Sequence, residues 1–157
     1  MERVQKEVQY WLMKSEPSCY GIDDLKRQKV GMWDDVRNYQ ARNYLREMKK
    51  GDRVLFYHSS CDVIGVAGIA EIAKESYPDP TQFDTKSYKY DPKSTKENPR
   101  WDSVDLKFVK KFKEVVTLNE LKLDPFFKEM LVVKKGMRLS VQPVAKKHYE
   151  KVVSFNS

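Results

Sequence analysis

Apolar residues fall mostly in short runs that have strand character. Residues 8–13 are rich in β-branched and aromatic side chains, and residues 53–58 and 63–73 form two more runs separated by a short polar turn. The last two runs together predict a β-hairpin. Gly65 and Gly68 lie inside the third run. Glycine there indicates a bend or a close approach by another group, such as a barrel corner or the floor of a ligand site.

Residues 33–51 combine a helical pattern with a mixture of polar side chains. Three apolar residues recur at the spacing of a buried helical stripe: Ala41, Leu45 and Met48. Asp34 or Asp35 can cap the start of this helix, and Gly51 can supply the left-handed residue at its end. We therefore expect a loop that opens into an amphipathic helix of about three turns.

The remaining elements are short. Residues 101–113 alternate as a half-buried strand, residues 22–26 fit a short helix, residues 138–143 fit a strand ended by Pro143, and residues 145–155 fit a closing helix. Two helix starts have cap signals, a Thr117–Glu120 capping box and the pair Asp124 and Pro125. Strands interleaved so irregularly with helices predict an α+β fold, a mixed or antiparallel β-barrel of five or six strands flanked by short helices.

Residues 77–100 differ from the rest of the chain. They contain four prolines and almost no aliphatic residues, but they include the aromatic residues Tyr77, Phe83, Tyr88 and Tyr90. A loop longer than about fifteen residues in a compact domain is usually functional or disordered. The aromatic content indicates that parts of this loop pack against the domain.

Composition narrows the class of protein. A chain of 157 residues has the size of one domain, 1–157, and its 40% hydrophobic and 34% charged residues are typical of a globular fold. The net charge of +7 favours polyanionic partners. Cys19 and Cys61 lack the spacing of a zinc site or a disulfide framework, and no apolar run reaches the length of a signal peptide or membrane span. We expect an intracellular protein.

The segment 33–44 is the strongest candidate for binding chemistry. It places flat rings, guanidinium groups and amides at the start of a helix, where free backbone N–H groups favour anions. This combination suits a phosphate and a base. The alternative is that Trp33 and Tyr39 are core residues and that the basic residues form an ordinary solvated helix face.

Six segments in order along the chain resemble the motifs of the EVE domain family: residues 10–17, 33–43, 56–59, 65–68, 77–79 and 138–143. The resemblance implies a PUA-like β-barrel related to the YTH readers of methylated adenine. It also implies an association with modified cytosine in DNA, or with modified bases in nucleic acid. One departure is Asp35, where the family usually has glycine; its carboxylate would weaken a phosphate contact unless it pairs with Arg37 or accepts from a base amino group.

Reading a modified base requires that the base leaves its stack, lies between flat side chains and meets fixed hydrogen-bonding groups. We expect the stacking wall from Trp33, with Tyr39 and Tyr57 as candidates for a second wall. Contacts to the base edge and flanking phosphates are expected from these residues: Asn38, Ser15, Ser59 and His58 at the edge, and Lys14, Arg37, Arg42 and Arg138 at the phosphates. Several of them have a structural alternative: core packing for the rings, a helix cap for Asn38, salt bridges for Arg42 and Arg138, and a structural hydrogen bond for His58.

The function expected from these features is a non-catalytic domain that binds nucleic acid carrying a modified base, with modified cytosine in DNA as the first expectation. No cofactor, metal or membrane is expected, and we expect a monomer, nuclear in a eukaryote or cytoplasmic in a bacterium. Alternatives are a protein-interaction adaptor that uses the 77–100 loop, an RNA modified-base reader, or a hydrolase with Cys61 as nucleophile beside His58. No nucleophile elbow or phosphate loop supports the hydrolase.

Overall fold

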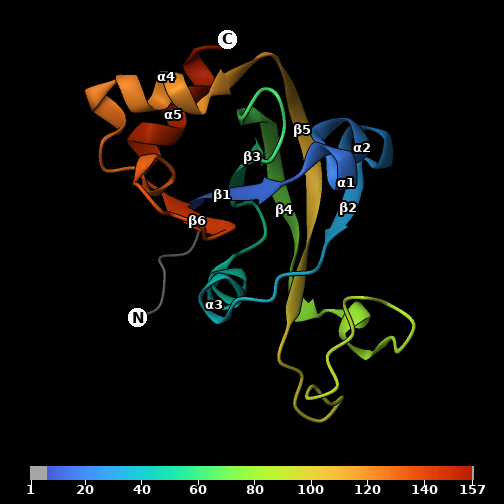
Figure 1. Cartoon of the computed structure of the whole chain (residues 1–157). Helices are drawn as coiled ribbons and strands as arrows, with labels where there is room; N and C mark the ends of the chain where they lie inside the picture. The colour runs from blue at the N-terminus through green and yellow to red at the C-terminus, as the bar shows by residue number, and fades with distance from the viewer. Residues whose placement is uncertain (1–6, 157) are drawn as a thin grey trace.

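A computed structural model describes residues 7–156, in which a six-stranded mixed β-sheet is flanked by short helices (Figure 1). The strands are β1 (Tyr10–Ser15), β2 (Val30–Trp33), β3 (Arg53–His58), β4 (Gly65–Pro78), β5 (Asp102–Thr117) and β6 (Val141–Val144). The α-helices are α1 (Pro17–Tyr20), α2 (Ile22–Gln28), α3 (Tyr39–Glu47), α4 (Leu118–Leu123) and α5 (Lys146–Ser154). Three single-turn 3₁₀ helices are η1 (Pro80–Phe83), η2 (Pro125–Phe127) and η3 (Leu131–Val133).

The strand order in the sheet is β2-β5-β4-β3-β1-β6. β1 runs parallel to β3, while the other neighbouring pairs are antiparallel. The two longest strands, β4 and β5, pair along most of their length and are joined by the segment that contains η1. This sheet confirms the expected α+β fold with mixed strand directions, and within residues 7–156 β2 and β6 are its two edges.

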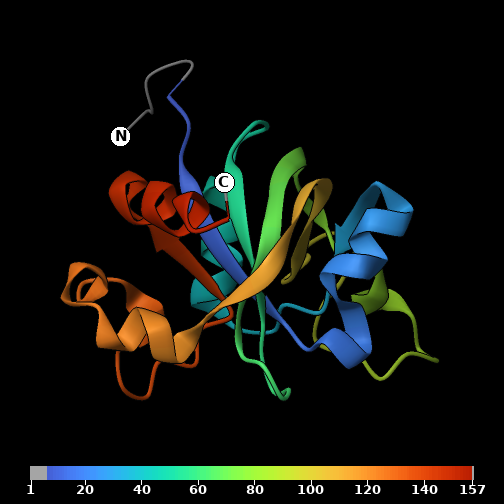
Figure 2. The ribbon, with the colours of Figure 1, turned by 90° about the horizontal axis from the view of Figure 1, so that it is seen from above.

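Both faces of the sheet are covered by helices. Along β1, Trp11 and Met13 point into one buried cluster and Leu12 into the other, as the alternation of a strand requires. Residues of α2 and α3 complete the first cluster, and residues of α4, η2, η3 and α5 complete the second. Seen from above, α5 and α2 lie on opposite sides of the strands (Figure 2). The central strands are therefore buried on both faces.

Most of the predicted elements are confirmed. β3 and β4 form the expected hairpin, and Ala41, Leu45 and Met48 are buried as a stripe. Gly51 has the left-handed φ of +95°, but α3 ends at Glu47 with Met48 as an extended C-cap, so the prediction that Gly51 ends this helix was wrong. The capping box at Thr117 and Glu120 is formed, as is the Asp124 cap, which starts the 3₁₀ helix η2.

Several local predictions were wrong. The cap of α3 is Asn38, whose Oδ1 accepts from the Ala41 N–H at 3.0 Å, and neither Asp34 nor Asp35 caps it. Residues 30–33 form the edge strand β2, which was not predicted, and Pro143 lies within β6 instead of ending it. At Gly68, in contrast, the expected close approach is confirmed, because a Cβ there would overlap the carbonyl oxygen of Lys110 on β5.

Asp35 adopts φ of +65°, in the left-handed region that favours glycine. Asp and Asn tolerate this region better than most residues. The glycine expected here from the family resemblance is therefore explained by backbone conformation. In this chain an aspartate adopts this conformation and adds a carboxylate.

Candidate functional site

A cleft of about 750 Å³ opens where several chain segments meet. β1 and β3 end there side by side, and the Ser59 N–H donates to the carbonyl oxygen of Ser15 at 2.9 Å. The lining comes from the end of β1 and α1, the end of β2 and the residues after it, the β3–β4 turn, the 77–100 loop and the residues before β6: Lys14, Ser15, Glu16, Cys19, Tyr20, Met32, Trp33, Asp34, Asp35, Val36, Ser59, Ser60, Tyr88, Lys89, Arg138 and Ser140.

Trp33 ends β2 and borders this cleft, but its indole is only 6% exposed. Its ring meets the rings of Phe56 and Tyr20 edge to face, at centroid distances of 5.5 and 6.3 Å. These contacts are the favoured geometry for aromatic pairs in a core. Trp33 is therefore both a core residue and a border of the cleft, with little ring surface open to a ligand.

The charge of the cleft is mixed. Its cationic groups are Lys14, Lys89 and Arg138, and its acidic groups are Glu16, Asp34 and Asp35. Lys89 Nζ lies 3.0 Å from Asp34 Oδ2, so one cation is already paired. Such a cleft presents acceptors as well as donors, and this suits a polar heterocycle better than a bare phosphate.

Lys14 projects from β1 and donates from Nζ to the carbonyl oxygen of Met137 at 3.2 Å. Partial burial lowers the pKa of Lys14. The same ammonium lies 5.7 Å from the ring centroid of Tyr57. Lys14 is thus a partly desolvated cation at the cleft wall, where an electrostatic contact is stronger than in water.

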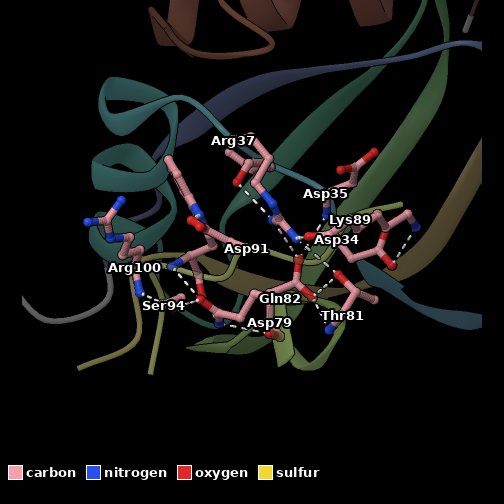
Figure 3. A network of polar contacts seen from close by, with 12 residues as sticks. Asp34, Asp35, Arg37, Asp79, Thr81, Gln82, Lys89, Asp91, Ser94 and Arg100 are labelled. Carbon is pink, nitrogen blue, oxygen red and sulfur yellow. Dashed lines mark hydrogen bonds and ion pairs between the residues drawn. The ribbon is translucent and has the colours of Figure 1, made fainter. Parts of the chain in front are cut away.

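Arg37 holds the loop that borders the cleft (Figure 3). Its guanidinium donates to Asp79 Oδ2 at 3.1 Å, to Thr81 Oγ1 at 3.1 Å and to the carbonyl oxygen of Lys89 at 2.8 Å. The Asp35 N–H donates to the same oxygen of Asp79 at 2.9 Å. The residues after β2 and the 77–100 loop are therefore fastened to each other through one buried carboxylate.

Asp79 is fully buried. Burial alone would raise the pKa of its carboxyl group, but hydrogen bonds from Thr81, the Asp35 backbone and Arg37 outweigh burial and hold the pKa below its usual value. Asp79 is therefore a charged anchor within the loop, and its carboxylate is saturated with donors.

Gln82 organises the rest of the loop (Figure 3). Its amide nitrogen donates to the carbonyl oxygens of Asp79 and Trp101 at 2.8 and 2.7 Å. Its amide oxygen accepts from the Ser94 hydroxyl at 2.5 Å and from the Trp101 N–H at 3.0 Å. One buried side chain thus satisfies backbone groups at both ends of the loop, which explains how a segment with few aliphatic residues is ordered.

Of the predicted site residues, the structure brings five to the cleft lining: Lys14, Ser15, Trp33, Ser59 and Arg138. The other six lie outside it: Arg37, Asn38, Tyr39, Arg42, Tyr57 and His58. Arg37 contacts the carbonyl oxygen of the lining residue Lys89, and Asn38 is the N-cap of α3. Their ligand-binding roles stay predictions.

Tyr39 and Arg42 form a separate stack on α3. The Tyr39 ring lies 4.9 Å from Trp101, and the Arg42 guanidinium lies 4.7 Å from the Tyr39 centroid. Arg42 also donates to the carbonyl oxygen of Arg100 at 2.9 Å. These contacts secure α3 against the end of the 77–100 loop.

Tyr57 and His58 are tied to the fold. Tyr57 is 2% exposed within the second core cluster. His58 Nε2 accepts from the Ile22 N–H at 3.1 Å, so this nitrogen is unprotonated. Burial lowers the pKa of His58, and the charge of Lys111 adds to this effect while Asp23 opposes it.

Tyr88 and Lys89 are among the cleft residues that were not predicted to bind a ligand. The only sequence signal was the aromatic content of their loop, which could not show where the loop folds back. Their position depends on Asp34, Arg37 and Asp79, distant partners that no local pattern connects.

No group of three or more His, Cys, Asp or Glu side chains among residues 7–156 could hold a metal ion. No helix in that range is both long and apolar enough to cross a membrane.

A distant structural likeness supports the fold. The YTH domain of the Zygosaccharomyces rouxii MRB1 protein superposes with a TM-score of 0.56 at 14% identity, over 100% of this chain and 92% of that one. This similarity confirms that the chain has the expected YTH-like fold.

Closer relatives share both sequence and structure with this chain. Thymocyte nuclear protein 1 of Danio rerio is 43% identical over 166 residues, which cover 94% of this chain and 71% of the relative. A crystal structure of a Pseudomonas syringae protein has a TM-score of 0.91 at 47% identity, over 94% of this chain and 99% of that one. The human THYN1 protein, crystallised in complex with DNA containing 5-methylcytosine, has a TM-score of 0.88 at 42% identity, over 95% and 98% of the two chains. The EVE domain matches residues 9–155, and the chain therefore belongs to the EVE domain family.

Proposed function

We propose that this chain binds DNA and reads a modified cytosine, 5-methylcytosine first, in the cleft beside Trp33. The observation that carries the proposal is the human THYN1 protein, which is 42% identical and is crystallised with DNA containing 5-methylcytosine. The cleft volume of about 750 Å³ falls in the range of small-molecule sites and is ample for one nucleobase.

The mixed polarity of the cleft supports base recognition. Cytosine presents an amino donor next to a ring acceptor, and Asp34 and Lys89 place an acceptor and a donor 3.0 Å apart in the lining. Arg138 and Lys14 lie on another part of the lining. Because both are cations, they suit the phosphates that flank an extruded base. The net charge of +7 also favours DNA.

The proposed function involves no catalysis. His58, the only histidine near Cys61 in sequence, uses Nε2 to accept from the Ile22 backbone. Cys61 Sγ lies 3.4 Å from the carbonyl oxygen of Val63, within its own turn. These contacts support structural roles for both side chains. If His58 were the general base for a Cys61 nucleophile, its unprotonated nitrogen Nε2 would have to accept the thiol proton instead of the Ile22 N–H.

The test is a titration of two labelled DNA duplexes that differ in one cytosine methyl group, followed by fluorescence anisotropy at two salt concentrations. We expect tighter binding of the methylated duplex at both concentrations, and weaker binding of both duplexes at higher salt. Equal affinity for the two duplexes at both salt concentrations would contradict the proposal.

A matched pair of charge reversals locates the binding surface. Arg138 lines the cleft, whereas Lys135 is an equally exposed cation in the same segment outside it. Arg138→Glu should weaken binding of both duplexes and reduce the salt slope by about one, as the loss of one phosphate contact does. Lys135→Glu makes the same change in net charge and should have a smaller effect. An equal effect of the two variants would place the DNA elsewhere.

A further inference from the structure

Tyr88 is the most conspicuous unexplained side chain of the cleft. It lines the cleft and is 85% exposed, although an aromatic ring gains stability from burial. Its ring is contacted by the ammonium of its neighbour Lys89, which lies 5.6 Å from the ring centroid. Nothing in the packing of the fold accounts for a tyrosine at this position.

The other two aromatic residues of the lining, Tyr20 and Trp33, are less exposed than Tyr88. Trp33 is 6% exposed, with Phe56 and Tyr20 packed edge-on against it. Stacking needs ring surface that is accessible on one side. Trp33 can therefore support the floor of the cleft, but it cannot provide a full stacking face without leaving the core.

The loop that carries Tyr88 is held by contacts of the next residue, Lys89, and of the Tyr88 hydroxyl group. The carbonyl oxygen of Lys89 accepts from Arg37 Nη2 at 2.8 Å, and Lys89 Nζ pairs with Asp34 at 3.0 Å (Figure 3). The Tyr88 hydroxyl lies 3.4 Å from Asp35 Oδ2.

These anchors place the ring at the cleft before any ligand arrives. Ordering a loop in advance lowers the entropic cost of binding. An exposed and pre-positioned aromatic ring is accessible to a ligand that enters the cleft.

We propose that Tyr88 is the stacking wall for the base that enters the cleft, and that the Lys89–Asp34 ion pair positions it; this inference rests on the proposed function. A nucleobase stacked on Tyr88 would have its edge toward the polar groups near Asp34 and Asp35. The role first expected of Trp33 is thereby divided, with Trp33 forming the floor and Tyr88 the wall.

The experiment compares Tyr88→Ala with Tyr90→Ala in the duplex titration described above. Tyr90 lies two residues away, is 39% exposed and does not line the cleft, so it is a matched loop tyrosine. Loss of one stacking contact should weaken binding of the methylated duplex by about 5- to 150-fold for Tyr88→Ala. Tyr90→Ala should bind within about twofold of the wild type, a difference far below that of a lost stacking contact.

Two further variants separate stacking from other effects. Tyr88→Phe keeps the ring and loses only the hydroxyl contact to Asp35, so it should bind nearly as the wild type does. Tyr88→Trp introduces an indole whose fluorescence should be quenched when a base stacks on it. Thermal unfolding of all variants should match the wild type, since the ring of Tyr88 is exposed.

The outcomes distinguish this inference from the proposed function. If the wild type does not prefer the methylated duplex, the proposed function fails. If the wild type does prefer it and Tyr88→Ala binds as tightly as Tyr90→Ala, the function stands and the role of Tyr88 is wrong. A loss of binding in Tyr88→Phe as large as that in Tyr88→Ala would assign the effect to the hydroxyl group and also overturn the stacking role.

Discussion

Asp79→Asn should destabilise the protein strongly, although the two side chains have nearly the same shape. The carboxylate accepts from four donors: the Asp35 N–H, the Thr81 N–H, the Thr81 hydroxyl and Arg37 Nη1. Asparagine keeps one acceptor oxygen and places an amide donor where the other oxygen was. If the asparagine oxygen keeps the two Thr81 contacts, the amide NH₂ group faces the Asp35 N–H and Arg37 Nη1. These two donors then lose their acceptor and meet another donor.

The size of the effect follows from these two lost contacts. A hydrogen bond to a charged group contributes about 1.5–3 kcal/mol, and the 24% exposure of the Arg37 side chain argues for the lower end of that range. We therefore expect a loss of about 3 kcal/mol in the free energy of unfolding. For a domain of this size, that loss lowers the melting temperature by about 6–12 °C.

Chemical denaturation at neutral pH measures this loss, and Asp84→Asn is the control. Asp84 lies in the same loop and is exposed, and its Oδ1 accepts a local bond from the Lys86 N–H. The control should change the free energy of unfolding by less than about 0.5 kcal/mol. If Asp79→Asn were as stable as Asp84→Asn, Asp79 would not be the anchor described above.

The pH dependence of the same variant is a second check. The folded-state pKa of Asp79 is lowered, so its contribution is present above the unfolded-state pKa and is lost as the pH falls through the folded value. The wild type should therefore lose stability relative to Asp79→Asn below about pH 4. An unchanged difference between the two proteins at acid pH would contradict the lowered pKa.

Two other variants test the packing and the histidine contact. Gly68→Ala should lower the free energy of unfolding by about 3 kcal/mol, because the new methyl group overlaps the Lys110 backbone. Gly51→Ala has open space around it and a φ of +95°, and it should lower the free energy of unfolding by about 1 kcal/mol. Thermal denaturation compares the two variants, and equal losses of stability would refute the close contact at Gly68. NMR should show that His58 titrates below its ordinary pKa of 6.5, so the stability it contributes is present above pH 6.5 and is lost as the pH falls through the folded-state pKa. His58→Gln can still accept from the Ile22 N–H and should remove this pH dependence of stability. An unaltered pH profile in the variant would refute the role of His58.

Local patterns predicted the elements whose signals are contained in a few consecutive residues. The stripe of Ala41, Leu45 and Met48 has a period that only a helix satisfies, and the capping box of Thr117 and Glu120 spans one turn. β2 was missed because four residues that include a glycine cannot display a strand period. Its identity comes from pairing with β5, which is distant in sequence.

The candidate site was harder to predict for the same physical reason. Arg37 was expected to contact phosphate, but its guanidinium is used by Asp79 and by the backbone of the 77–100 loop. Asn38 has a side chain that suits a base edge, and it also suits a helix cap, which is where the structure places it. Which of two chemically reasonable roles a polar residue adopts depends on partners that the local sequence does not contain.

The position of β1 within the sheet has a consequence for how the chain folds. Leu12 pairs with Leu55 on β3 and with Gln142 on β6, so one of the first strands to be synthesised acquires its second neighbour from one of the last. Contacts between residues so far apart in sequence slow folding, because a long loop must close before they form. During synthesis on the ribosome, the backbone groups along one edge of β1 therefore have no strand partner until β6 has emerged.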